Sequence, residues 1–142
     1  MITNSNHIIT GKENALYAIR DLGSSQENFE ETVDGTVTHV TSDGNGTIFA
    51  VTDSNKLYAY TLSDNTLVAK DFSPVDLSAA VVSPILLHAD KIILNAGDKA
   101  LIHNKNTGEL TREVTGINTI SNGKSITFIL NSSQNKVVAG NT

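Results

Sequence analysis

The sequence predicts an all-β fold built from repeated units of about forty residues. Short runs of β-branched and aromatic residues alternate with Asn, Asp, Gly and Ser, which favour tight turns. No stretch keeps the apolar spacing of a helix over the roughly ten residues that a helix needs. We therefore expect a single repeat domain over residues 1–142, with approximate repeats at 1–35, 36–75, 76–116 and 117–142.

The repeat is clearest in residues 47–70 and 91–114. In both segments a β-branched run is followed by a polar turn, a second apolar run and a turn that contains Asn-Thr. Weaker copies lie at 7–19 and 125–139. The copies stand about 40 residues apart, the period of four-stranded propeller blades, when four isoleucines are taken as equivalent: Ile8, Ile48, Ile92 and Ile126.

Two apolar triplets, at 92–94 and 100–102, indicate sheets that are buried on both faces. A sheet with one face in water would alternate apolar and polar residues, whereas sheets stacked around a ring bury both faces. The sequence therefore predicts a β-propeller-like array of about three to four antiparallel blades, with a β-sandwich as the alternative fold. Because an open array leaves sheet edges uncovered, we expect an interface at its ends, formed either by oligomerisation or by further parts of a larger protein.

The tightest predicted turn is Asp43-Gly44-Asn45-Gly46, between strands expected around 36–41 and from Thr47. Its alternating oxygen ligands also resemble the start of a calcium loop, but the further acidic positions and the distal glutamate of such a loop are missing. We expect a hairpin turn here, and a second one at 106–108.

Composition excludes several classes of protein. A net charge of −5, with ten basic residues spread along the chain, lacks the basic patch that nucleic-acid binding requires. The longest apolar runs fall far short of the roughly 20 residues of a membrane span, so no membrane partner is expected. The sequence has no cysteine, which is compatible with any redox compartment. Residues 1–7 lack a signal-peptide pattern, which predicts a cytoplasmic location if the chain is complete.

Residues 99–110 resemble the repeat of the pyrroloquinoline-quinone-like β-propellers, a superfamily whose blades are similar to those of WD-repeat proteins: an apolar strand is followed by a polar turn and a Thr-Gly pair. Residues 82–93 resemble the Ser-Pro-apolar segment that leads into the next strand of that repeat. The tryptophan that follows the Thr-Gly pair in the family is absent, and this sequence contains no tryptophan. Packing between blades is then expected from other apolar residues: Leu67, Phe72, Leu110 and Val114.

Few residues are candidates for chemistry, and each has a structural explanation. The histidines His7, His39, His88 and His103 are too scattered for a local metal motif, and we expect most of them at the surface or at strand ends. Ser83 lacks a nucleophile motif and is expected to shape a turn. The tyrosines are expected to pack between blades: Tyr17, Tyr58 and Tyr60. The acidic run is expected on a solvated edge strand: Glu27, Glu30, Glu31 and Asp34.

We therefore assign no catalytic, cofactor-binding or metal-binding residue. The sequence favours a non-enzymatic binding or scaffold module that self-associates through its open ends, with a homodimer preferred and a protein or small molecule as ligand. The alternative, which the family resemblance alone suggests, is a propeller-type enzyme or subunit with an axial metal or quinone. The quinone enzymes of this family use a longer chain and vicinal cysteines that this sequence lacks.

Overall fold

The computed structural model describes residues 7–21, 23, 25–63, 66–116, 120–121, 124–131 and 136–141. Every regular element in these residues is a β-strand, and all the strand pairs are antiparallel, so the predicted all-β array is confirmed. The search for a helix long and apolar enough to cross a membrane found none in the described part of the chain.

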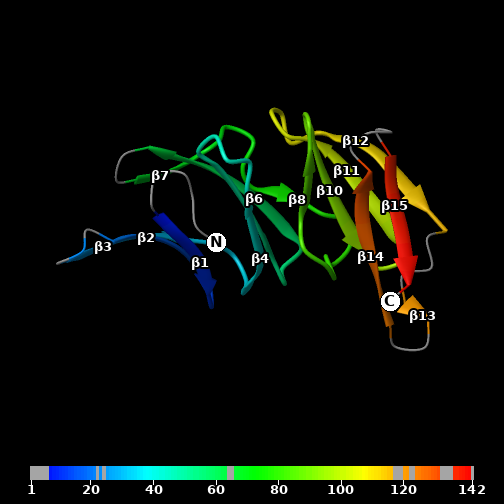
Figure 1. The fold of residues 1–142 in the computed structure, drawn as a ribbon, viewed down its shortest axis with the longest axis horizontal. Helices are drawn as coiled ribbons and strands as arrows, with labels where there is room; N and C mark the ends of the chain where they lie inside the picture. Colours follow the sequence, from blue (N-terminus) through cyan, green and yellow to red (C-terminus); the bar gives the residue numbers. More distant parts are fainter. Residues whose placement is uncertain are drawn as a thin grey trace. The chain divides into compact units, whose positions relative to one another are not determined.

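The first half of the sequence forms two sheets, drawn from blue to green in Figure 1. Sheet A has the order β1-β2-β3 and consists of β1 (His7–Lys12), β2 (Ala15–Asp21) and β3 (Gln26–Thr32). Sheet B has the order β4-β5-β6-β7 and consists of β4 (Val37–Ser42), β5 (Thr47–Thr52), β6 (Lys56–Ser63) and β7 (Thr66–Ala69). The short strand β8 (Val75–Asp76) also pairs with β6, beyond the residues that pair with β7.

The second half forms two further sheets, drawn from green to red in Figure 1. Sheet C has the order β12-β11-β10-β9 and consists of β9 (Leu86–His88), β10 (Lys91–Ala96), β11 (Lys99–Asn104) and β12 (Leu110–Thr115). Sheet D has the order β13-β14-β15 and consists of β13 (Ile120–Ser121), β14 (Lys124–Asn131) and β15 (Lys136–Asn141). The chain divides into two compact units, 1–78 and 79–142, and the single domain of four repeats stays a prediction.

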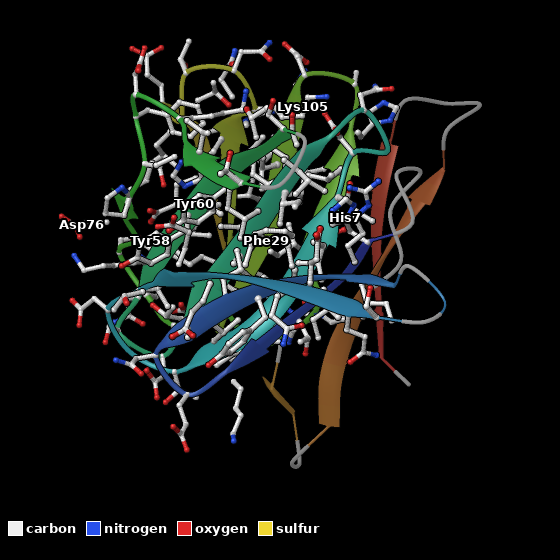
Figure 2. All side chains as sticks on the ribbon, turned by 90° about the vertical axis from the view of Figure 1, so that its left-hand side faces the viewer. His7, Phe29, Tyr58, Tyr60, Asp76 and Lys105 are labelled. Carbon is white, nitrogen blue, oxygen red and sulfur yellow. The ribbon has the colours of Figure 1, made fainter. Side chains whose placement is uncertain are left out.

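One face of sheet A packs against sheet B. Figure 2 shows Phe29 of β3 with Tyr58 and Tyr60 of β6 between the two sheets. Apolar side chains that are excluded from water favour the stacking, because burial of apolar surface is the main stabilising contribution to folding. The buried members of this core are Ile9, Leu16, Ala18, Val33, Ile48, Ala50, Tyr58, Tyr60 and Leu67.

Sheets B and C carry strands that are buried on both faces. In β5, Ile48 and Ala50 face sheet A, while Phe49 and Val51 lie on the opposite face, and all four are 0% exposed. In β10 the triplet 92–94 is also buried, which confirms the interpretation of this triplet. A simple sheet with one wet face would not give this burial.

The predicted hairpin at 43–46 is confirmed. Asp43 Oδ1 accepts hydrogen bonds from the backbone N–H of Asn45 at 2.9 Å and of Thr47 at 3.1 Å, so the carboxylate closes the turn between β4 and β5. The turn between β11 and β12 uses Asn104 Oδ1 in the same manner, accepting from the N–H of Asn106 and of Thr107.

Candidate functional site

The face of sheet A that points away from sheet B is the candidate site. Because side chains alternate along a strand, Ile9, Leu16 and Phe29 face sheet B and their neighbours face the other way. We call this opposite side the outer face, and its residues include Ile8, Thr10, Lys12, Tyr17, Ile19 and Glu30.

Cross-strand pairing places the apolar residues of the outer face at its centre. Ile8 of β1 lies directly opposite Ile19 of β2, and Thr10 lies opposite Tyr17. Ile8 is 41% exposed, whereas its repeat equivalents in β5 and β10 are fully buried. The alternating burial of β1 therefore differs from the continuous burial of β5 and β10, and it marks a sheet with one uncovered apolar face.

The outer face carries one charge of each sign on its strands β1 and β3. Glu30 lies directly opposite Tyr17 across the pairing of β2 and β3. Partial burial, and then the Glu30 carboxylate, raise the pKa of Tyr17. Lys12 is exposed at the end of β1. The apolar centre is therefore flanked by a lysine and a glutamate, as in interfaces with a polar rim.

The acidic run lies on β3, the outermost strand of sheet A, and on the residues that follow it, so the predicted charged edge strand is confirmed. Its members do not form one cluster, because they alternate between the faces of the sheet. Glu27 lies 4.0 Å from Arg20, and the Asp34 carboxylate lies 4.0 Å from Lys56 Nζ. Edge charge of this kind discourages the pairing of further strands.

Two of the three tyrosines pack between sheets, as expected. The rings of Tyr58 and Tyr60 stack with centroids 6.3 Å apart, and the Tyr58 hydroxyl accepts a hydrogen bond from the Asp34 N–H at 2.8 Å. Burial, with smaller contributions from Glu31 and Tyr58, raises the pKa of Tyr60 to about 12. The prediction is wrong for Tyr17, because the strand alternation places it on the outer face.

His7 is the first residue of β1 and His103 the next to last of β11, in line with the expectation of histidines at the surface or at strand ends. Both side chains are nevertheless buried, with 3% and 2% exposure. The His7 ring packs beside Phe29, with centroids 6.4 Å apart, and His103 Nδ1 donates to the Gly108 carbonyl at 2.9 Å. His103 therefore has a hydrogen-bond partner for one ring nitrogen, and His7 has an aromatic neighbour for its ring. Among the described residues, no three His, Asp or Glu side chains gather where they could hold a metal ion.

His103 should make the stability of the chain sensitive to acid. Burial lowers the pKa of His103 below the ordinary 6.5, and its Nε2 has no hydrogen-bond partner within the described structure. Below pH 6.5 the unfolded chain binds a proton that the folded chain resists, so the free energy of unfolding falls as the pH drops from 6.5 towards the folded pKa. We expect urea titrations to show this loss.

A His103→Asn variant serves as the control for that prediction. Asn keeps an N–H for the Gly108 carbonyl but does not titrate, so the pH dependence should flatten over the same interval. His39, whose pKa burial also lowers, is present in both proteins and should contribute the same dependence to each. An unchanged pH dependence in His103→Asn would contradict the assignment.

The remaining predicted residues are structural. Ser83 is 8% exposed in the loop between β8 and β9, where the neighbouring Val82 N–H donates to the Asn95 carbonyl. Leu67 packs in the core between sheets A and B, as predicted for a residue between blades. The same prediction is wrong for Leu110, which is 49% exposed because it lies on β12, the edge strand of sheet C.

The sequence interpretation missed the outer face. Its signal was present in β1, where Ile8-Ile9 is followed by Thr10 and Gly11, whereas Ile92-Ile93 is followed by Leu94. The interruption of the apolar run indicates a strand with one wet face.

Three solved structures show what the chain is similar to. BamB from Moraxella catarrhalis matches with a TM-score of 0.61 and 14% identity over 90% of this chain and 43% of that one. Apo AztD from Citrobacter koseri matches with a TM-score of 0.62 and 11% identity, over 80% of this chain and 32% of that one. Hsv2 from Kluyveromyces lactis matches with a TM-score of 0.54 and 13% identity, over 89% of this chain and 39% of that one.

No family model matches the sequence, and no curated protein does. The three similar structures are β-propellers, and this chain spans less than half the length of each. At such low sequence identity the similarity shows the fold alone. The described residues form four antiparallel sheets that match part of these structures, so the chain has the fold of a partial β-propeller.

Proposed function

We propose that the protein is a non-enzymatic binding or scaffold module that self-associates, with the outer face of sheet A covered by a second copy of the chain. The observation that supports this function is the 41% exposure of Ile8 at the centre of an apolar face whose equivalents in sheets B and C are buried. Contiguous apolar surface of this kind is a feature of association sites.

A second copy fits the outer face because it brings more sheets of the same kind. Propellers close with 4 to 8 blades, and two copies of a chain with four sheets supply a number within that range. The chain covers 43% of the length of BamB and 39% of that of Hsv2, so two copies approach the size of those rings.

The charges on β1 and β3 are compatible with a copy of the same chain at this face. Lys12 and Glu30 give these two strands one charge of each sign, so the two strands add no net repulsion towards a second, equally acidic chain. The uncharged centre of Ile8, Ile19 and Tyr17 supplies the apolar surface that association removes from water.

Substitution of Ile8 by Arg tests this function. A charge at the centre of the face must be buried without a partner in the dimer, while the folded monomer keeps it in water. We expect sedimentation velocity over a range of concentrations to give a dimer dissociation constant at least about tenfold higher, or about 1.4 kcal/mol.

Val68→Arg is the matched control. Val68 is 53% exposed on β7 of sheet B and is not part of the outer face of sheet A, so the dissociation constant should stay at the unmodified value. Equal weakening by both variants would indicate a general charge effect, and no weakening by Ile8→Arg would reject the outer face as the association surface.

A further inference from the structure

The turn between β4 and β5 holds an asparagine whose side chain is free to react with its own backbone. Asn45 is exposed, and within the described residues its carboxamide makes no hydrogen bond. The following residue is Gly46, which has no side chain to shield its backbone nitrogen. The Gly46 N–H also makes no hydrogen bond in the described structure, although the N–H groups of Asn45 and Thr47 are both bound to Asp43 Oδ1.

The turn between β11 and β12 provides the contrasting case. Asn106 is likewise exposed, but its neighbour is Thr107, whose β-branched side chain crowds the backbone nitrogen. The Thr107 N–H also donates to Asn104 Oδ1 at 3.2 Å, and the Asn106 N–H donates to the same oxygen at 2.8 Å. The nitrogen that would have to attack Asn106 is therefore already engaged.

We propose that Asn45 is a site of spontaneous modification, in which the folded chain converts it to aspartate and isoaspartate. After loss of its proton to solvent, the Gly46 nitrogen attacks Cγ of Asn45. A C–N bond forms, the bond from Cγ to Nδ2 breaks, and Nδ2 takes up a proton from solvent and leaves as ammonia, which gives a five-membered succinimide ring. Water then adds to one of the two ring carbonyls and opens the ring, so water is the only other reactant.

Both products change the turn that they occupy. Each places a new carboxylate two residues from Asp43, whose Oδ1 closes the turn. The isoaspartate product also lengthens the backbone by one methylene group between β4 and β5. The hydrogen bond from the Leu62 N–H to the Gly46 carbonyl, 2.8 Å long, ties this turn to β6 and is strained by that change. Modification therefore loosens one end of sheet B.

The test is to hold the intact, folded protein at mildly alkaline pH and to follow each asparagine by peptide mass spectrometry, with isoaspartate detected by enzymatic carboxyl methylation. We expect the peptide with Asn45 to gain the mass of an amide-to-acid conversion about tenfold faster than the peptide with Asn106, a difference of about 1.4 kcal/mol in activation free energy. The Asn45→Gln variant, whose longer side chain disfavours ring closure, should lose the fast conversion at this position.

Two results would overturn the proposal. Equal rates at Asn45 and Asn106 would show that the free Gly46 nitrogen gives no selectivity. Conversion of Asn45 in urea but not in the folded chain would show that the turn bound by Asp43 protects it.

Discussion

Replacement of Phe49 by Ala lowers the free energy of unfolding by about 3–5 kcal/mol. Phe49 is 0% exposed in β5, on the face of sheet B opposite to sheet A. The substitution removes the largest fully buried side chain of the chain's described residues and leaves a cavity that close-packed sheets cannot fill. Urea unfolding followed by circular dichroism measures the loss.

Val68→Ala is the control for Phe49→Ala. Val68 lies in the same sheet but is 53% exposed, so its truncation should change the free energy of unfolding by no more than about 0.5 kcal/mol. If Phe49→Ala were as mild as Val68→Ala, sheet B would not be buried on both faces, and the comparison with propeller blades would lose its physical basis.

Gly11→Ala should destabilise the chain by about 1–3 kcal/mol, although Ala is normally the better residue in a strand. Gly11 of β1 packs against Val37 of β4, and a Cβ atom at position 11 would overlap Cβ and Cγ1 of that valine. Since Gly11 does not have a positive φ, backbone strain does not contribute. Thermal and urea unfolding of the variant measure the loss.

A stabilising effect of Gly11→Ala would contradict this close approach of sheets A and B. Without the overlap, Gly→Ala would stabilise the chain by about 0.4–1 kcal/mol, because Ala restricts the unfolded state. Val37→Ala in the same chain removes Cγ1 but keeps Cβ, so it should recover part of the loss caused by Gly11→Ala. Purely additive effects of the two substitutions would mean that the residues do not touch.

Local chemistry made the strands and turns predictable. The hairpin at 43–46 follows from Asp-Gly and Asn-Gly pairs, whose side chains and φ tolerance close turns without help from distant residues. The burial of residues 92–94 follows from their uninterrupted apolar character. In both cases the residues that predict the structure are the same residues that form it, or lie within a few positions of it.

The side of a sheet that a residue faces depends on partners far away in the sequence. Tyr17 and Tyr58 both lie in strands of aromatic and apolar residues, but only Tyr58 faces another sheet. Leu110 is exposed because β12 is an edge strand. The arrangement of strands and sheets, which the sequence leaves open, decides both cases.

The mass of the unmodified protein in solution, measured by light scattering after size exclusion over a range of concentrations, tests the central proposal most directly. Self-association through the outer face of sheet A predicts a mass that rises with concentration to twice the chain mass of 15.1 kDa. A constant mass of 15.1 kDa at every concentration would contradict it, and would mean that the exposed centre around Ile8 is not covered by a second copy.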